Sequence, residues 1–285
     1  MYKDVVIVIP VYKSSLDENE ILSFKQCLNI LNKYTICIVT YESLSIEYYK
    51  CQFDLFGVDY CIKYFDAIYF KNTIGYNHLM TSKCFYKSFE EYKYMLVYQL
   101  DAYVFKDELE VWCAKGFDLI GAPLIEDKYG VENKYFLKGM NGGLSLRNIG
   151  YCIRLLSYKG PVLRPNAIWK IVKNEFPTDK FKMLFYYISR SLGRQNTLKY
   201  FTDKYYINED LLFTLTLHVS WVNNDLQKGE TWIYPNLPGL NDALKFAFER
   251  YPRFMFEINN KELPFGCHAW EKYEYDSFWK KYIEE

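Results

Sequence analysis

The feature that most constrains the fold is an alternation of short apolar runs with helix-patterned segments along the first 125 residues. The run VVIVIPVY (residues 5–12) is rich in β-branched residues, and YTICIVTYES (34–43) contains a second such run. Between them, residues 16–31 place apolar side chains at helical spacing. A strand, a helix and a strand in this order form a βαβ unit with parallel, buried strands. The sequence therefore predicts an α/β fold with a doubly wound sheet.

The remainder of this half continues the alternation. We predict a strand region at 62–70, a helix over 75–92 with Asn77 or Thr81 near its start, a strand through residues 95–105, and a short strand at 117–124 closed by Pro123. No G-x-G-x-x-G or G-x-x-x-x-G-K-[ST] pattern is present, which excludes dinucleotide and P-loop sites. Ligands of doubly wound sheets bind beyond the carboxyl ends of the strands. Three polar residues fall at or near such ends, namely Thr40, Glu42 and Asp101.

Asp101 is the most informative of these residues, because it interrupts the apolar stretch YQLDAYVF. Burying an unpaired carboxylate costs roughly several kcal/mol of free energy unless another group compensates its charge. The sequence therefore predicts a partner for Asp101, and a bound cation is one such partner.

Composition narrows the class of protein. The chain has 35 Lys/Arg and 35 Asp/Glu, so no global basic field favours nucleic-acid binding. Aromatics make up 20% with 29 Tyr, which either reflects genome composition or favours a sugar or nucleotide site. The eight cysteines are scattered without a C-x-x-C pair, and the N-terminal apolar run is too short for a signal peptide or membrane helix. We expect a reducing, cytoplasmic location.

The second half contains three further stretches that combine polar groups with unusual context. Asn141-Gly142-Gly143 is either a plain hairpin turn or a backbone that approaches a ligand closely. Glu209-Asp210, after Asn208, either caps an apolar helix or supplies catalytic carboxylates. His268 within PFGCHAW is either a structural histidine or a ligand. His78 and His218 lie inside helical patterns and are interpreted as structural.

Five motifs occur in a fixed order between about Ile62 and Trp270, namely YQLDAYVF, FDLIGAP, MNGGLSLRN, EDLLF and PFGCHAW. With them the chain resembles a bacterial family of glycosyltransferases that was long catalogued as a domain of unknown function and occurs among polysaccharide-biosynthesis genes. The resemblance implies a GT-A-like fold with a mixed sheet. It further implies one domain over 1–285, with a Rossmann-like nucleotide-sugar half (1–125), an acceptor and catalytic half (126–285) and a basic helical insertion near 154–204.

The resemblance also assigns roles to residues. GT-A enzymes bind a divalent cation and the donor diphosphate with a D-x-D motif, of which Asp101 matches the first carboxylate while Tyr103 occupies the second acidic place. His268 resembles the C-terminal histidine that ligates the metal in many of these enzymes. Asp210 corresponds to the general base of many inverting enzymes, with Glu209 beside it. Asn141, Gly142 and Gly143 resemble the glycine-containing loop that lines the sugar site.

The leading hypothesis is therefore an inverting glycosyltransferase, hexosyltransferase-like, in capsule or other surface-polysaccharide synthesis. It would use a nucleotide-sugar donor (a UDP-sugar first), a glycan or lipid-linked acceptor, and Mn²⁺ or Mg²⁺. A metal-independent or retaining transferase is the second hypothesis, which Tyr103 favours. A non-catalytic nucleotide-sugar- or glycan-binding protein on the same fold is the third.

The segment from Arg154 to Lys204 contains eleven Lys/Arg and three acidic residues. Within it, KFKMLFYYISRSLGR (180–194) combines Lys180, Lys182, Arg190 and Arg194 with many apolar side chains. Two structures fit this composition. One is an amphipathic helix packed on the core with a solvated basic edge, and the other is an interfacial helix at the inner face of the membrane.

Overall fold

The structure is a computed structural model that describes residues 4–127, 134–204, 208–216 and 235–283. Its strands are β1 (Val5–Pro10), β2 (Thr35–Thr40), β3 (Tyr60–Tyr64), β4 (Tyr94–Tyr98), β5 (Ala102–Val104), β6 (Leu119–Asp127), β7 (Lys134–Asn148), β8 (Ala247–Phe248) and β9 (Gly266–His268). Its longer helices are α1 (Glu18–Ile30), α2 (Glu47–Phe56), α3 (Thr73–Met80), α6 (Ile149–Ser157), α7 (Pro165–Glu175) and α8 (Lys180–Ser191).

The shorter helical elements connect these strands and helices. They are η1 (Ala67–Phe70), α4 (Lys83–Lys87), α5 (Leu109–Ala114), α9 (Leu198–Lys204), α10 (Glu209–Leu211), η2 (Leu212–Thr216), α11 (Leu240–Phe246), α12 (Pro252–Ile258), η3 (Tyr275–Trp279) and α13 (Lys280–Ile283). Among the described residues, no helix combines the length and the apolar character needed to cross a bilayer.

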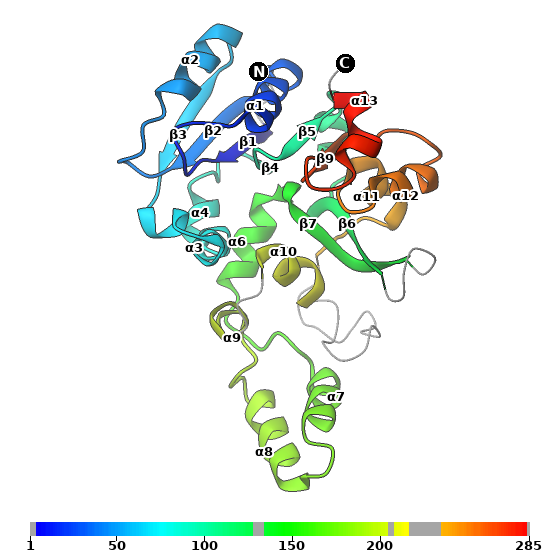
Figure 1. Cartoon of the computed structure of the whole chain (residues 1–285). Coiled ribbons are helices and arrows are strands. Elements are labelled where there is room, and N and C mark those ends of the chain that lie inside the picture. Colours follow the sequence, from blue (N-terminus) through cyan, green and yellow to red (C-terminus); the bar gives the residue numbers. More distant parts are fainter. Residues whose placement is uncertain (1–3, 128–133, 205–207, 217–234, 284–285) are drawn as a thin grey trace.

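A six-stranded mixed sheet forms the centre of the molecule, in the order β3-β2-β1-β4-β7-β6. The strands β3, β2, β1 and β4 are parallel, whereas β7 runs antiparallel to both β4 and β6. Helices α1 and α2 lie on one side of the sheet and α3, α4 and α6 on the other (Figure 1). The predicted class is confirmed, because this is an α/β fold with a Rossmann-like parallel half and a mixed sheet. The boundary expected at residue 125 lies within β6, so both expected halves contribute strands to one sheet.

Local sequence explains why the parallel half forms. β1 is buried at every position, as expected for a strand covered by helices on both faces. α1 begins at Asp17 with a capping box, in which the Asp17 side chain accepts a hydrogen bond from the Glu20 N–H and Glu20 accepts one from Asp17. Its buried face includes Phe24 and Leu28, which join the main hydrophobic core.

Strand order creates a switch point between β1 and β4. The chain adds β2 and β3 on one side of β1 and then crosses to add β4 on the other side. Connections at such a point leave in opposite directions, which opens a crevice beyond the carboxyl ends of the two strands. The residues that follow β1 and β4 therefore flank a ready-made ligand crevice.

Four predicted elements differ from the structure. The strand region expected at 62–70 is a strand only up to Tyr64, and residues 67–70 form the 3-10 helix η1. The strand expected through Asp101 ends at Tyr98, and a turn closed by a hydrogen bond from the Ala102 N–H to the Gln99 carbonyl carries Asp101 between two sheets. The strand expected to close at Pro123 continues as β6, because β6 is the sheet edge, where a missing N–H is tolerated.

The helix expected over 75–92 is instead two helices, α3 and α4. α3 begins after Asn72, whose side chain accepts a hydrogen bond from the Gly75 N–H, so neither Asn77 nor Thr81 is its N-cap. At its other end the Thr81 hydroxyl donates to the Asn77 carbonyl, a local bond that competes with helix continuation.

Two further parts of the structure consist mostly of residues from the second half. A small sheet, β5-β9-β8, packs with α12, η3 and α13 around buried Trp270 and Trp279. Helices α7 and α8 form a hairpin that extends away from the main sheet (Figure 1). The predicted helix in the basic segment is present as α8.

Candidate active site

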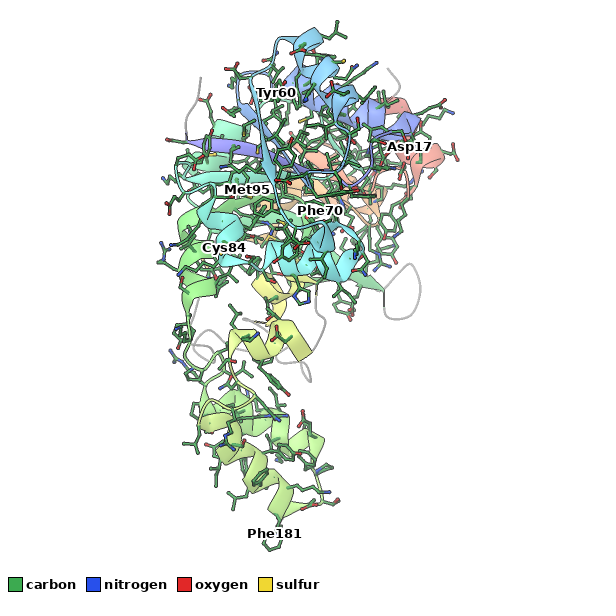
Figure 2. The ribbon with its side chains drawn as sticks, turned by 90° about the vertical axis from the view of Figure 1, so that its left-hand side faces the viewer. Asp17, Tyr60, Phe70, Cys84, Met95 and Phe181 are labelled. Atoms are coloured by element: carbon green, nitrogen blue, oxygen red, sulfur yellow. The ribbon has the colours of Figure 1, made fainter. Side chains whose placement is uncertain are left out.

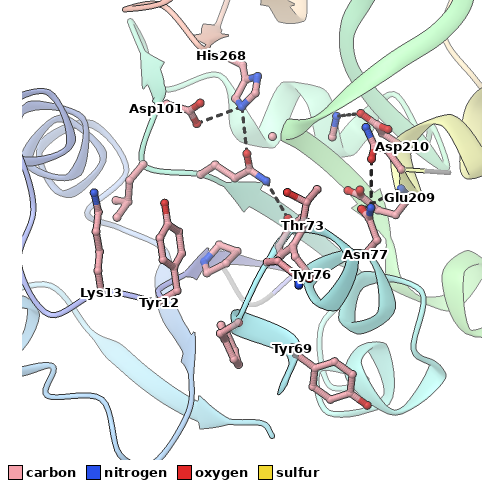
Figure 3. Close-up of a pocket in the computed structure, with 18 of the residues that line it drawn as sticks. Tyr12, Lys13, Tyr69, Thr73, Tyr76, Asn77, Asp101, Glu209, Asp210 and His268 are labelled. Atoms are coloured by element: carbon pink, nitrogen blue, oxygen red, sulfur yellow. Dashed lines mark hydrogen bonds and ion pairs between the residues drawn. The ribbon is translucent and has the colours of Figure 1, made fainter. Parts of the chain in front are cut away.

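A pocket of about 580 Å³ opens at the switch point. Its walls come from the segments after β1 and β4, from α3, from the middle of β7, from α10 and from β9. Residues from each of these are Tyr12, Lys13, Tyr76, Gln99, Asp101, Gly142, Gly143, Asp210 and His268. This volume lies in the usual range for a small-molecule site. Figure 3 shows Asp101 and His268 on one side of the pocket, and Glu209 and Asp210 on another, with Thr73 and Tyr76 between them.

The Asn141-Gly142-Gly143 stretch is an irregularity inside β7 and not the hairpin turn that was one of its interpretations. On β6, Pro123 pairs with Met140 whereas Gly121 pairs with Ser145, so β7 carries extra residues between these two pairs. A bulge of this kind re-aims a strand locally and is frequent beside active sites. Here it turns residues 141–143 into the pocket.

Both glycines of the bulge are required by what packs against them. A Cβ at Gly143 would lie 2.0 Å from His268 Nε2, and a Cβ at Gly142 would lie 2.6 Å from Glu209 Oε1. Any larger residue at either position would displace a functional side chain. Protein side chains make this close approach, and the predicted approach of a ligand to the same backbone stays a prediction.

The partner of Asp101 within the chain is His268. Asp101 Oδ1 lies 3.1 Å from His268 Nε2, and Glu249 Oε1 lies 3.3 Å from Nδ1 on the opposite side of the ring. Glu249 is buried, as is His268, whereas Asp101 is half-buried. The two carboxylates hold the imidazole in one orientation, and β5 and β9 bring Asp101 and His268 together by pairing Ala102 with His268.

The electrostatics of this group follow from its geometry. Burial by itself would lower the pKa of His268, but hydrogen bonds and charge attraction from Asp101 and Glu249 outweigh burial and raise the pKa to about 10. For Asp101 burial would raise the pKa, and the bond to His268 outweighs it, so the pKa of Asp101 is lowered. The two flanking carboxylates therefore favour the protonated form of the imidazole.

Glu209 forms a buried ion pair with Arg147, whose Nη2 lies 2.8 Å from Glu209 Oε1. Arg147 also donates to the Tyr86 hydroxyl, the Ser145 hydroxyl and the Gly142 carbonyl. Its pKa is raised well above the ordinary value, since nearby Tyr86 and Glu209 outweigh the lowering effect of burial. Glu209 lines the pocket and its carboxylate neutralises Arg147 beside the bulge, and its predicted catalytic role stays a prediction.

Asp210 lies at the pocket wall beside the bulge. The Gly142 N–H donates to Asp210 Oδ2 at 3.2 Å, and the side chain is half-buried. α10 is anchored from α3, because Asn77 accepts a hydrogen bond from the Glu209 N–H and donates to Asn208. Asp210 therefore projects from a short, fixed helix into the pocket.

Gln99 connects the two ends of the pocket. Its amide nitrogen donates to the Tyr76 hydroxyl at 3.0 Å, and its amide oxygen lies 3.1 Å from His268 Nε2. Tyr12, which follows β1, is exposed at the pocket wall and offers an aromatic face. Aromatic rings of this kind stack on planar bases and on sugars.

Three predicted site residues lie outside the pocket. Thr40 is fully buried and Glu42 is exposed at the end of β2, one strand away from the switch point, so neither lines the crevice. Tyr103 is buried in the small-sheet core, with its ring 6.3 Å from that of Trp270. The second acidic place of a D-x-D motif is therefore a packing position in this chain.

Sequence reasoning missed Glu249, Arg147, Gln99, Tyr76 and Lys13. Glu249 carried a usable signal, because it is a lone acidic residue beside the apolar run ALKFAF, as Asp101 is within its own stretch. Arg147 carried a similar signal within MNGGLSLRN, where an arginine follows an alternating apolar segment. The other three are ordinary polar residues in sequence, and only the switch point brings them to the pocket.

The chain belongs to a family that is described as "Protein of unknown function (DUF5672)", whose model matches residues 59–268. The five motifs led us to expect a family of this description over nearly the same residues. No curated protein matches the sequence.

Two solved structures resemble this chain. Core-mannan synthase A from Aspergillus fumigatus, in its Mn/GDP form, aligns with 9% identity and a TM-score of 0.39 over 75% of this chain and 69% of that chain. A glycosyltransferase involved in the glycosylation of the major capsid of PBCV-1 aligns with 8% identity and a TM-score of 0.35 over 98% of each chain.

Proposed function

We propose that this protein is a nucleotide-sugar-dependent glycosyltransferase that moves a sugar to a hydroxyl of a glycan or lipid-linked acceptor in surface-polysaccharide synthesis. One observation carries the proposal: Asp101, His268 and Asp210 meet in a single pocket at the topological switch point. These residues come from three distant parts of the sequence. Their convergence at the position where doubly wound sheets bind nucleotides supports a transfer site better than a structural role.

The arrangement supplies the groups that glycosyl transfer needs. A hydroxyl must lose a proton as it attacks the anomeric carbon, and a carboxylate within reach can accept it. We assign this role to Asp210, which the Gly142 N–H orients and which corresponds to the base of the GT-A enzymes that the motifs resemble. Transfer in one step with such a base inverts the anomeric configuration.

The charge of the departing diphosphate must also be balanced, and the residues present fit a divalent cation. His268 Nε2 and Asp101 Oδ1 are a nitrogen and an oxygen donor 3.1 Å apart, as two neighbouring ligands of an ion with bonds of about 2.1 Å would be. Glu249 holds Nδ1, as the outer carboxylate of a carboxylate–histidine–metal arrangement does. Gly143 has no Cβ that would displace the imidazole from this position.

Asp101 and His268 would hold this cation, and Mn²⁺ is preferred because it accepts imidazole as well as carboxylate. When bound, it would neutralise charge on the donor diphosphate. The described residues contain no group of three or more His, Cys, Asp or Glu side chains placed to hold a metal. Two protein ligands leave the other coordination positions to phosphate and water, which suits a cation that arrives with its nucleotide.

The donor end of the pocket favours a nucleotide. Tyr12 presents an open ring beside the end of β1, and Lys13 lies next to it with Nζ 2.6 Å from Glu20. A UDP-sugar is the first donor to test, and GDP- and CMP-sugars are the others.

All eight cysteines lie in described segments and are free thiols. We retain the cytoplasm as the proposed location.

The test is a screen of the purified full chain with UDP-, GDP- and CMP-sugars, each with Mn²⁺ or with EDTA. The assay measures thermal shift for binding and released nucleotide for turnover. We expect one donor to bind in a Mn²⁺-dependent way, and Asp101→Asn to abolish that dependence while the fold persists. Asp59→Asn, an exposed carboxylate after α2, is the matched control.

The two alternative hypotheses give different results in the same screen. A metal-independent or retaining transferase would bind and turn over its donor equally well in EDTA. A non-catalytic binding protein would bind a donor or a glycan without releasing nucleotide. If no nucleotide sugar shifts the melting temperature under either condition, the proposal is wrong.

A further inference from the structure

The outward face of α8 is apolar and exposed. Phe181, Leu184, Phe185, Ile188 and Leu192 are between 48% and 89% exposed, with Phe181 the most exposed of them. At 100° per residue these five positions occupy an arc of about 100°, which makes one continuous apolar stripe. Figure 2 shows Phe181 at the far tip of the α7–α8 hairpin, away from the sheet.

The opposite face of α8 is already packed. Tyr186 stacks on Phe176 with ring centres 4.8 Å apart, and Tyr187 meets Trp169 of α7 edge to face at 5.4 Å. Arg190 is buried and pairs with Glu175 at 3.0 Å. The helix therefore has two faces with apolar side chains, of which only one is packed. The packed face fits the expectation of a core-packed helix, but the solvent side is an apolar stripe and not only a basic edge.

Positive charge surrounds the exposed stripe. On the helical wheel, Lys180 and Lys182 lie at about 90° to 110° on either side of its centre, and both are exposed. Arg194 is exposed just beyond the C-terminal end of α8. The segment 154–204 has eleven basic and three acidic residues, a net charge of eight positive, and because the whole chain is neutral the remainder is eight negative.

We propose that the α7–α8 hairpin docks the protein on an anionic membrane surface, with the stripe of Phe181, Leu184, Phe185, Ile188 and Leu192 inserted at the headgroup boundary. Apolar side chains bordered by lysines are the composition of an interfacial helix, in which the lysine stems extend past the apolar layer to the phosphates. Trp169 lies against Tyr187 and is partly exposed, and Trp is enriched at this depth of a bilayer.

A second copy of the chain fits this face less well. A two-fold contact would bring the stripe of one copy onto the same stripe of the other and would set Lys180 and Lys182 beside their own counterparts. Like charges around an apolar contact oppose association, whereas anionic headgroups complement them.

The test is co-sedimentation of the full chain with vesicles of phosphatidylglycerol and phosphatidylcholine, and with vesicles of phosphatidylcholine alone. We expect binding to the anionic vesicles at low ionic strength and its loss as salt screens the surface. Phe181→Ser with Phe185→Ser should weaken partition at least about tenfold. Lys180→Gln with Lys182→Gln should weaken it about fivefold per charge.

Matched controls make the outcome specific. Leu55→Ser on α2 changes an apolar residue that is 74% exposed, and Lys83→Gln with Lys87→Gln on α4 removes two exposed charges. Neither control should alter vesicle binding, and none of these variants should change the melting temperature. Because the readout is binding and not turnover, the result is independent of the transfer reaction.

Two results would overturn the proposal. One is that wild-type protein fails to sediment with anionic vesicles at low salt. The other is that sedimentation-velocity measurements give a dimer that Phe181→Ser with Phe185→Ser converts to a monomer, which would identify the face as a contact between copies.

Discussion

The pocket and the α7–α8 hairpin depart from ordinary burial in opposite ways. At the pocket, charged groups are buried, namely Arg147, Glu209, Glu249 and His268. At the hairpin, large apolar groups are exposed. Each arrangement costs free energy relative to a conventional one, since buried charges lose hydration and exposed apolar surface orders water.

The two regions also differ in how the cost is offset. In the pocket the charges neutralise one another within the chain, so the site is fixed before any ligand arrives. On the hairpin no described residue covers the stripe, and the proposed membrane docking would cover it. The pocket is thus organised for chemistry, which needs fixed groups, and the hairpin for docking.

The largest expected effect is on the free energy of unfolding, and it comes from breaking one ion pair in each region. Glu209→Ala leaves Arg147 buried and unneutralised, and should lower the free energy of unfolding by about 3–5 kcal/mol. Glu175→Ala breaks the more exposed pair with Arg190 and should cost about 1 kcal/mol or less. Urea unfolding of both variants measures the difference. Equal losses would mean that the pocket is no more dependent on its charges than the hairpin.

The next prediction separates a catalytic role of Asp210 from a structural role. Asp210→Asn should lower kcat by about 10²- to 10⁴-fold and leave the donor Kd unchanged, since a base acts on the acceptor proton. Asp179→Asn, which removes the charge but keeps an N-cap oxygen at the start of α8 in the hairpin, should leave kcat unaltered. If Asp210→Asn keeps turnover within a few-fold of wild type, the remaining role of this residue is structural, as the acceptor of the Gly142 N–H.

A smaller effect concerns the bulge. Gly143→Ala places a methyl group where His268 Nε2 lies, so the imidazole must move, and Mn²⁺ affinity should fall by about 10- to 100-fold. Gly239→Ala is the control, because a methyl group there meets no described atom within 4 Å. Isothermal titration with Mn²⁺ and donor measures both. Unaltered affinity in Gly143→Ala would place the cation away from His268.

The last prediction concerns pH. In EDTA, the raised pKa of His268, about 10 against about 6.5 when unfolded, contributes stability that is complete below pH 6.5 and is lost as pH rises toward 10. The loss should not exceed about 1.4 kcal/mol per pH unit. The melting temperature should therefore fall between pH 7 and pH 9, and it should fall more in wild type than in His268→Gln. Mn²⁺ binding should strengthen over the same range, because the cation competes with the imidazole proton.

The sequence by itself determined the parallel half of the sheet. The segments 5–12 and 34–43 each contain a run of apolar, β-branched residues without polar alternation. Such a run forms a strand that is buried on both faces, between two layers of helices. The same reasoning identified Asp101, since a carboxylate in apolar surroundings requires a partner. It also identified α8, whose apolar residues recur at helical spacing.

Only the tertiary structure decided which polar residues share the pocket. Thr40, Glu42 and Asp101 looked alike in sequence, yet the chain crosses over between β3 and β4, and this crossing puts the crevice at β1 and β4 and leaves the end of β2 outside. The partners of Asp101 and Asp210 come from β9 and β7, and the second partner of His268 follows β8; no local pattern links these residues. Long-range strand pairing sets these contacts, and it depends on the packing of the whole sheet more than on any one segment.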